Sequence, residues 1–263
     1  MMHVQKPLIT VVTVVLNSRD LIEQTIVSVL EQTYENIEFI VVDGESTDGT
    51  LDILRKYRSR INFLISEPDD GIYSGMNKGV AIASGQWINF MNAGDTFNSC
   101  DSILDIFEFP RGKEKIIYGD VLVNYGKFSI IKKAERLYNL WSGMKFSHQS
   151  AFIDTQYHKQ NKYNEDYKIT ADFDFFYKAR KNNILFKREN MVISNVVVGG
   201  VSEINRIETI LDCMRVMQSM SQGQLILLCY KIILLDIKIR SYLKRLLPAN
   251  LVDRIIKIKN FKI

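Results

Sequence analysis

The sequence has 263 residues, of which 46% are hydrophobic and 24% charged, and its formal net charge is +4. This composition is typical of a globular protein and excludes disordered, collagen-like and low-complexity chains. A charge of +4 is too small for a nucleic-acid binder, which gathers many more basic residues on one face. The 3 cysteines are scattered and form no CxxC pair. Neither a disulfide framework nor a zinc site is indicated, and a reducing cytoplasm is the simplest expectation.

The first hundred residues alternate between short apolar runs and segments with apolar residues at helical spacing. Strands are predicted at 8–16, 37–43, 61–66 and 86–92, with helices at 21–31, 50–57 and 73–83 between them. Nearly continuous apolar strands separated by helices indicate a parallel sheet covered on both faces, an α/β fold. Ligands bind at the carboxyl ends of such strands, so the polar residues that follow each strand are candidates for a site.

Later segments are predicted to form a hairpin at 115–133, a helix beginning near Thr170 and a strand at 184–198. From Ser202 the pattern is helical to the end of the sequence. Two domains are therefore expected, a catalytic-type domain at 1–202 and a helical extension at 203–263. The apolar run Leu8–Leu16 is interpreted as a buried strand, and Leu225–Leu235 is interrupted by Lys231, so no spanning helix is predicted.

Six motifs in order resemble one enzyme family. They are VVTVVLN, VVDGESTDGT, SEPDDGIYSGMNKGVAIASGQWINFMNAGD, SHQ at 147–149, ADFD at 171–174 and GGVS at 199–202. Together they resemble the inverting family 2 glycosyltransferases of GT-A fold, and most closely the bacterial branch that assembles O-antigen, capsule and colanic-acid-type polysaccharides. The resemblance implies a Rossmann-like, mainly parallel central sheet flanked by helices. The helical C-terminal extension lies outside the recognisable pattern.

The resemblance implies that Asp43 accepts a hydrogen bond from the uracil ring of a UDP-sugar, since a carboxylate is a pure acceptor and uracil N3 is a donor. The alternative is a helix-capping network, for which Thr47 or Asp48 is the better candidate. Relatives commonly carry a second acid directly after this Asp, where Gly44 stands here, and Glu45 is a candidate to replace it. The implied donor-binding residues are Asn17, Asp43, Glu45, Asp69, Asp70, Lys78 and Asn92. Asp69 and Asp70 are equally explained as acids at a helix start.

Asn92-Ala93-Gly94-Asp95 stands where many relatives have two or three acids that bind a metal. Asp95 is the remaining carboxylate and the predicted ligand of Mn²⁺ or Mg²⁺, with the donor diphosphate supplying further oxygens. Such a cation would stabilise the charge on the departing diphosphate. An ordinary Asx turn at the end of a strand is the alternative.

Asp172 is implied to be the general base that takes a proton from the acceptor hydroxyl. Asp174 lies about 200° further around the helix, so it is expected to face solvent or to cap the helix. A helix-dipole role for both acids is the alternative. His148, Gln149, Gly199 and Gly200 are placed on the acceptor or diphosphate side, although a structural histidine and a plain glycine turn would also explain them.

The sequence thus predicts a metal-dependent, inverting hexosyltransferase that uses a nucleotide sugar, with UDP as the expected nucleotide. The implied acceptor is a saccharide linked to polyprenyl diphosphate in bacterial surface polysaccharide synthesis. A catalytically inactive relative that binds nucleotide sugar within an assembly complex is the alternative. A nucleotidyltransferase is disfavoured, because no glycine-rich basic loop follows the first strand.

The C-terminal tail differs in charge from the rest of the chain. Residues 224–263 contain nine basic and two acidic residues, a charge of +7, which leaves −3 for residues 1–223. A basic, aliphatic tail is typical of contact with an anionic membrane surface. The predicted location is therefore the cytoplasm, peripheral at the inner face of the cell membrane. Packing of a helical pair on the domain or on a second subunit is the alternative.

Overall fold

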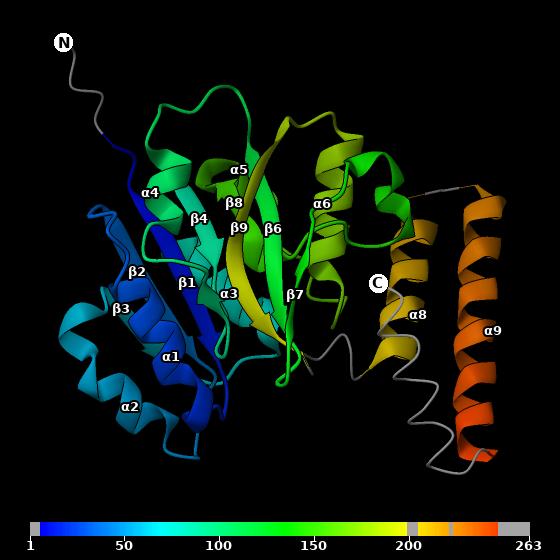
Figure 1. The fold of residues 1–263 in the computed structure, drawn as a ribbon, viewed down its shortest axis with the longest axis horizontal. Helices are drawn as coiled ribbons and strands as arrows, with labels where there is room; N and C mark the ends of the chain where they lie inside the picture. The colour runs from blue at the N-terminus through cyan, green and yellow to red at the C-terminus, as the bar shows by residue number, and fades with distance from the viewer. Residues whose placement is uncertain (1–5, 199–204, 221–222, 247–263) are drawn as a thin grey trace. The chain divides into compact units, whose positions relative to one another are not determined.

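The structure, a computed structural model, describes residues 6–198, 205–220 and 223–246. The chain divides into two compact units, residues 1–204 and 205–263 (Figure 1). The predicted domain boundary between residues 202 and 203 lies outside the described residues, so it stays a prediction.

The first unit is built on a sheet whose first half is parallel. Strands β1 (Ile9–Val15), β2 (Ile37–Asp43), β3 (Phe63–Ser66) and β4 (Trp87–Phe90) lie in the order β3-β2-β1-β4, and each pairs in parallel with its neighbours. All seven residues of β1 are buried, as expected for a central strand covered on both faces. The carboxyl ends of the four strands therefore lie along one edge of the sheet.

The second half of the sheet is mixed. Strand β8 (Ala151–Asp154) pairs antiparallel with both β4 and β6 (Ile116–Asn124), and β6 pairs in parallel with β9 (Phe186–Val197). Strands β7 (Ser129–Lys132) and β5 (Thr96–Phe97) add antiparallel to β6 and β9. The predicted hairpin and the strand after the last helix of this unit are both present. The four-residue β8 was not expected, because it is too short to show a pattern in the sequence.

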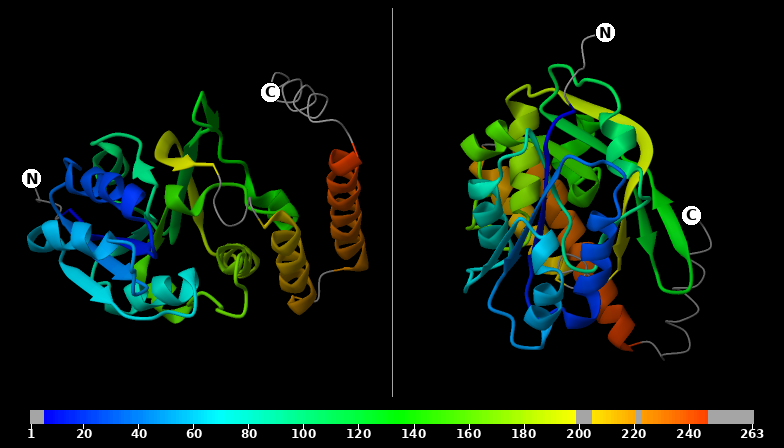
Figure 2. Two further views of the ribbon diagram at one scale, coloured as in Figure 1. Left: turned by 90° about the horizontal axis from the view of Figure 1, so that it is seen from below. Right: turned by 90° about the vertical axis from the view of Figure 1, so that its left-hand side faces the viewer.

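Helices cover both faces of the sheet. They are α1 (Arg19–Leu30), α2 (Thr50–Lys56), α3 (Ile72–Ile82), α4 (Ser102–Phe107), α5 (Thr155–Gln160) and α6 (Ala171–Lys181). Figures 1 and 2 show α1 and α3 on opposite faces of β1. Helix α1 buries Ile22, Ile26 and Val29 at helical spacing, which is the pattern from which this helix was predicted.

Two glycines bring α3 close to the sheet. A Cβ atom at Gly79 would lie 2.5 Å from Val12 Cγ1, and one at Gly75 would lie 2.7 Å from Val14 Cγ1. Both distances are below any real carbon contact, so a side chain at either position would push the helix away from β1. The close approach fixes the position of Tyr73, which stands at the beginning of the same helix.

A buried histidine lies in the aromatic core under α5 and α6. His158 is fully buried, stacks on Phe175 at 4.6 Å between ring centroids, and meets Phe90 and Tyr163 edge-on. Burial lowers the pKa of its imidazole from 6.5 to about 4, because the apolar surroundings disfavour the charged ring. The histidine is therefore neutral in the folded protein at neutral pH.

The second unit contains helices α8 (Arg206–Ser219) and α9 (Gln224–Leu246), which pack against each other. Cys213, Val216 and Met217 of α8 and Tyr230 of α9 are buried. Across the described ranges of the chain, no helix has both the length and the apolar composition needed to cross a bilayer.

His158 is expected to make the folded protein sensitive to acid. Its pKa is about 4 when folded and 6.5 when unfolded, so the unfolded chain takes up a proton first as pH falls through this interval. The stability that the neutral His158 contributes is fully present above pH 6.5. Acidification from pH 6.5 toward pH 4 lowers the free energy of unfolding by up to about 3 kcal/mol. Urea unfolding at pH 7, 5.5 and 4.5 should show that His158→Phe loses less free energy of unfolding than the wild type. Equal losses in the two proteins would contradict the assignment.

Candidate active site

The loops after β1 and β2 are tied together by hydrogen bonds. The backbone N–H of Asn17 donates to Ser46 Oγ at 2.8 Å, and Asn17 Oδ1 accepts from the Thr47 N–H at 2.9 Å. Asp48 accepts from the backbone N–H groups of Arg19 and Thr50, at the starts of α1 and α2. The capping function predicted for Thr47 or Asp48 thus belongs to Asp48, which anchors two helices at once.

Asp43 ends β2 and is completely buried, with 0% of its surface exposed. Its carboxylate accepts from the Ser46 N–H at 3.1 Å and from the Ser66 hydroxyl at 2.7 Å. Ser46 belongs to the loop after β2, and Ser66 is the last residue of β3. In this conformation Asp43 thus connects the loop after β2 with the end of β3.

Asp69 occupies the space beside Gly44. A Cβ atom at residue 44 would lie 2.8 Å from Asp69 Oδ2, which is closer than any real contact. The other carboxylate oxygen of Asp69 accepts from the Gly71 N–H at 3.0 Å. A carboxylate from the loop after β3 therefore lies beside Gly44, while Glu45 is exposed; the function expected of Glu45 stays a prediction.

Lys78 and Asp70 lie at the same edge, on and before α3. Lys78 Nζ pairs with Glu67 at 2.9 Å and donates to the Pro68 carbonyl at 2.7 Å. The ammonium group is thus held over the loop after β3. Asp70 is exposed, and its backbone carbonyl accepts from Lys168 at 3.3 Å. This contact connects the loop after β3 with the segment that precedes α6.

Helix α1 holds the Asn92–Asp95 loop in place. The buried Thr25 hydroxyl accepts from the Gly94 N–H at 2.9 Å and donates to the Asp95 carbonyl at 2.8 Å. Gln24 Nε2 donates to the Gly94 carbonyl at 2.8 Å. Gly94 has φ +99°, a left-handed conformation that glycine adopts without strain. These hydrogen bonds hold the loop backbone against α1. The side chains of Asn92 and Asp95 take no part in them and contact His148 and Gln149 instead.

Asp95 Oδ2 accepts from Gln149 Nε2 at 2.7 Å. Burial raises the pKa of this carboxyl to about 6, although the Gln149 hydrogen bond and the nearby His148 oppose the rise. Gln149 Oε1 in turn accepts a short hydrogen bond from the Ser147 hydroxyl. The protein thus holds a carboxylate in surroundings that disfavour its charge, a condition that a bound cation would relieve.

The residues at this loop suit a divalent cation only in part. Asn92 Oδ1 is buried and accepts no hydrogen bond, so an unused oxygen lies on the same loop as the Asp95 carboxylate. Among the described residues no group of three or more His, Cys, Asp or Glu side chains could hold a metal. Mg²⁺ commonly takes one or two carboxylates and completes its shell with substrate phosphates and water. The donor set fits a cation that arrives with a diphosphate.

His148 connects the Asn92 loop with α6. Asn92 Nδ2 lies 3.1 Å from His148 Nε2, and His148 Nδ1 lies 3.4 Å from Asp172 Oδ2. An amide nitrogen only donates, so Nε2 is the acceptor and the ring proton is on Nδ1, directed toward Asp172. The side chain of Asn92 therefore points to a histidine 56 residues away, and it does not close an Asx turn.

Tyr73 approaches Asp172 from α3. Its hydroxyl lies 2.9 Å from Asp172 Oδ1 and 2.8 Å from the Ile169 carbonyl, and the Phe173 N–H donates to the same Oδ1 at 2.8 Å. Burial, together with the Asp172 charge, holds the pKa of Tyr73 well above its usual range. Tyr73 thus keeps a single proton, which it can give to only one of the two acceptors at a time. Oδ1 keeps the Phe173 N–H as a donor at 2.8 Å, whereas Oδ2 has the longer contact with His148 Nδ1 at 3.4 Å, so Oδ2 is the oxygen of Asp172 with the greater remaining capacity to accept.

The expectation for Asp174 was wrong. It does not face solvent, because only 2% of its surface is exposed, and it pairs with Lys178 one turn further along α6 at 2.6 Å. Burial raises the pKa of the Asp174 carboxyl, while the lysine lowers it. Helix α6 has three buried aromatic side chains around this position, and the aliphatic stem of Lys178 allows its ammonium to reach an acid set among them.

The structure therefore joins motifs that lie far apart in the sequence. Asn92, His148, Asp172 and Tyr73 form one connected chain of contacts, next to the Asp95–Gln149 pair. Gly199 and Gly200 lie outside the described residues. Tyr73, Thr25 and Ser66 were not predicted. Tyr73 and Ser66 stand inside the motif that begins at residue 66, whereas Thr25 lies outside every motif.

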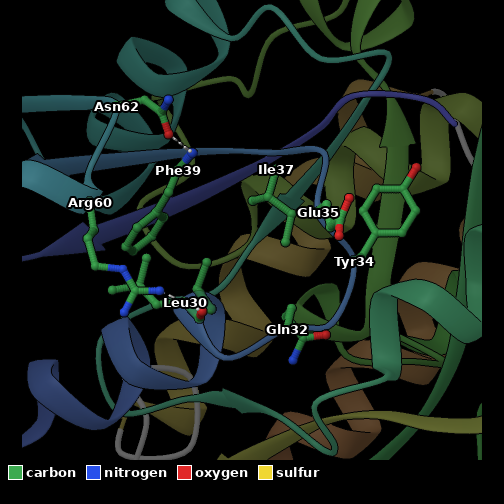
Figure 3. Close-up of a pocket in the computed structure, with 9 residues that line it drawn as sticks. Leu30, Gln32, Tyr34, Glu35, Ile37, Phe39, Arg60 and Asn62 are labelled. Carbon is green, nitrogen blue, oxygen red and sulfur yellow. Dashed lines mark hydrogen bonds between the residues drawn. The ribbon is translucent and has the colours of Figure 1, made fainter.

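A cavity of about 300 Å³ lies elsewhere, beside the end of α1 and the start of β2 (Figure 3). It is bordered by Leu30, Tyr34, Phe39, Arg60 and Asn62 among others. Arg60 spans part of it and donates to the Leu30 carbonyl. None of the predicted site residues borders this cavity, which lies at the amino end of β2 and not at the carboxyl ends where the motifs meet.

The sequence profile of Glycosyl transferase family 2 matches residues 10–186. The chain belongs to this family. A PGL/p-HBAD biosynthesis glycosyltransferase of Mycobacterium tuberculosis is 29% identical to this family 2 glycosyltransferase over 213 residues, which are 78% of this chain and 81% of the relative. The putative teichuronic acid biosynthesis glycosyltransferase TuaG of Bacillus subtilis is 41% identical over 93 residues, 34% of this chain and 37% of TuaG.

Solved structures confirm the GT-A glycosyltransferase fold. S. aureus TarS 1-349 in complex with UDP superposes with a TM-score of 0.64 at 21% identity, covering 80% of this chain and 64% of that one. The mannosyltransferase PcManGT from Pyrobaculum calidifontis, in complex with GDP-Man and Mn²⁺, gives a TM-score of 0.65 at 18% identity, covering 84% and 66%. This family 2 glycosyltransferase therefore spans somewhat less than two thirds of the TarS chain.

Thr25 is expected to stabilise the Asn92–Asp95 loop. Thr25→Val keeps the shape of the side chain but leaves the Gly94 N–H and the Asp95 carbonyl without their partner, which should cost about 1–3 kcal/mol of unfolding free energy. Urea unfolding measures the loss. The matched control is Thr33→Val, whose hydroxyl bonds the exposed Asp101 carboxylate and should change stability by less than about 0.5 kcal/mol. Equal effects of the two substitutions would contradict the proposed anchoring.

Proposed function

We propose that this enzyme is an inverting glycosyltransferase that moves a sugar, a hexose in the expected case, from a UDP-sugar to the hydroxyl of an acceptor saccharide. The observation that carries the proposal is the connected set of Asn92, His148, Asp172 and Tyr73 next to Asp95. A carboxylate held between a tyrosine hydroxyl and an imidazole, close to the carboxyl ends of parallel strands, is suited to accept a proton in a ligand site.

Asp172 is the proposed general base. As the acceptor oxygen attacks the anomeric carbon, its proton passes to Asp172 Oδ2, the bond from that carbon to the diphosphate breaks, and UDP leaves with the electron pair. One displacement inverts the anomeric centre. The Tyr73 hydroxyl and the Phe173 N–H hold Oδ1 in place, so the carboxylate meets the substrate in a fixed orientation.

The donor is proposed to bind along the loops after β1, β2 and β3. The residues on that side are Asn17, Asp43, Glu45, Asp69, Asp70, Lys78 and Asn92. Asp43 acts there mainly by shaping the loop, since its carboxylate is buried and bonded, whereas Asp69 presents a carboxylate beside Gly44. Two similar structures are complexes with UDP and with GDP-Man, which supports a nucleotide-sugar donor.

Asp95 and Asn92 would hold a Mn²⁺ or Mg²⁺ ion together with the donor diphosphate. When bound, such an ion supplies positive charge that stabilises the leaving diphosphate. The raised pKa of Asp95 and the unused Asn92 oxygen support this assignment. Gln149 orients the Asp95 carboxylate through its amide, and His148 lies between this loop and the base.

The acceptor is proposed to be a saccharide carried on polyprenyl diphosphate, in the synthesis of a bacterial surface polysaccharide such as O-antigen or capsule. Two relatives are named as glycosyltransferases of PGL/p-HBAD and of teichuronic acid biosynthesis, which supports a glycan product. His148, Gln149, Gly199 and Gly200 are assigned to the acceptor or diphosphate side. The cytoplasmic face of the membrane is the proposed location, since the +7 charge of residues 224–263 suits an anionic surface.

Asp172→Asn is expected to lower the rate of transfer from UDP-sugars by at least about 100-fold, because the amide cannot take the proton. Transfer and UDP release are measured with a panel of UDP-sugars, with and without Mn²⁺. Asp174→Asn, on the same helix, is the control and should keep most of the activity. Near-normal transfer by Asp172→Asn would overturn the base assignment. Donor binding without transfer in the wild type would favour an inactive nucleotide-sugar-binding relative.

Tyr73→Phe tests the positioning of the base. The variant removes one donor from the Asp172 carboxylate, so the acid limb of the kcat/KM profile should move to higher pH, and kcat should fall by about 10-fold. The KM for the donor should change little. Tyr118→Phe, which removes a hydroxyl that donates to the Glu135 carbonyl at 3.4 Å from another buried tyrosine, serves as the control. An unchanged pH profile with a lower kcat would indicate that Tyr73 only supports the packing.

The basic tail is tested with vesicles. Full-length protein should float with phosphatidylglycerol vesicles and not with phosphatidylcholine vesicles, and added salt should weaken the binding. Reversing four charges, at Arg254, Lys257, Lys259 and Lys262, to Glu should abolish flotation. The control reverses four exposed lysines of the first unit, Lys127, Lys132, Lys133 and Lys162. Loss of binding in both variants, or in neither, would contradict a membrane function of the tail.

A further inference from the structure

Helix α9 has a row of exposed aliphatic side chains. Leu225 is 73% exposed, Leu228 51%, Ile232 58%, Leu235 58% and Ile239 49%. These five residues, the α9 seam, follow one another at spacings of three, four, three and four residues. Side chains at this spacing lie on one face of a helix. Single exposed aliphatic residues are common on protein surfaces, but a continuous row of five marks a surface that binds something.

The seam is not the face that packs on α8. Tyr230, which is 1% exposed, lies on the opposite side of α9 from the seam, and α8 packs against α9. Figure 2 shows α8 and α9 side by side. The helix therefore has a second apolar face after its contact with α8 is complete.

The spacing and the residue types of the seam are those of a coiled coil. In heptad notation Leu225, Ile232 and Ile239 take the a positions, and Leu228 and Leu235 take the d positions. Isoleucine at a with leucine at d favours two parallel strands. In the sequence Tyr242 and Leu246 continue the same spacing, which extends the pattern to three heptads. A row confined to a and d is narrower than the apolar face of a helix that lies on a lipid surface or a protein core.

The charges beside the seam fit a second copy in parallel. Lys231 and Lys238 occupy the g positions and Asp236 an e position, and all three are exposed. In a parallel pair, g of one helix faces the following e of the other, so Lys231 of one copy lies near Asp236 of the second copy. In an antiparallel pair the two rows of lysines would face each other and repel.

We propose that the α9 seam binds a second copy of the chain, with two α9 helices paired in parallel along Leu228, Ile232, Leu235 and Ile239. The contact is isologous and closes as a dimer. Because each α9 also packs on its own α8, the paired helices form part of a four-helix assembly, which supports a pairing of only three heptads. The inference concerns assembly and does not depend on the proposed transfer reaction.

Sedimentation equilibrium of the full chain tests the proposal. Wild type at micromolar concentration should have twice the mass of one chain, which is 30.4 kDa. Ile232→Asp with Leu235→Asp should weaken self-association at least 100-fold. Ile131→Asp, at a similarly exposed aliphatic residue of β7, is the control and should leave the mass unchanged. Circular dichroism checks that each variant folds. A monomeric wild type, or a dimer that survives the double substitution, would overturn the proposal.

A cysteine variant tests the orientation while it changes only one residue of the apolar seam. Leu235→Cys should form a disulfide-linked dimer on mild oxidation, since equivalent d positions adjoin in a parallel pair, whereas Ile131→Cys should not. Absence of the cross-link in a wild-type-like dimer would overturn the parallel pairing. A monomeric wild type would overturn the proposal. If the double variant Ile232→Asp, Leu235→Asp then also fails to bind vesicles, the seam is a lipid-binding face.

Discussion

The carboxylate of Asp172 is the point at which four separate segments of the first unit meet. Helix α3 reaches it through Tyr73, the Asn92–Asp95 loop and the 3₁₀ turn at His148 reach it through the imidazole, and α6 supplies the acid itself. The glycines of α3 that let it lie close to β1 are part of the same arrangement, because they set how far Tyr73 extends. A substitution that moves α3 relative to β1 would therefore also move the Tyr73 hydroxyl relative to the Asp172 carboxylate.

Three buried acids of this glycosyltransferase have different partners. The Asp43 carboxylate accepts hydrogen bonds from Ser46 and Ser66, and the Asp174 carboxylate pairs with Lys178 on its own helix, while Asp174 Oδ1 has no hydrogen-bond partner among the described residues. The side-chain donor to Asp95 is the Gln149 amide, and burial raises the pKa of the Asp95 carboxyl to about 6. Within the described part of the chain, Asp95 has no cationic side chain paired with it as Asp174 does, and it shares its loop with the unused Asn92 oxygen, which is why it is the proposed metal ligand.

Much of the fold could be predicted from the sequence, because the first four strands and the helices between them carry strong and regular apolar patterns. The order of the polar motifs also indicated where a site would form. What could not be predicted depends on contacts between distant residues. Tyr73 meets Asp172 across 99 residues, and Thr25 holds Gly94 across 69 residues. Asp174 was misplaced because helical periodicity gives the direction of a side chain but not what covers it. The α9 seam was likewise hidden, since only the structure shows which of two apolar faces α8 occupies.

The glycine after Asp43 restricts how this loop edge can change during evolution. A side chain at residue 44 and the present position of the Asp69 carboxylate exclude each other, because the two would lie 2.8 Å apart. The two side chains therefore compete for one space. A lineage that gains a side chain at residue 44 must displace the carboxylate at residue 69, and one that loses the acid at 69 gains space at 44. Substitutions at these positions, 25 residues apart in the sequence, are expected to be inherited in pairs.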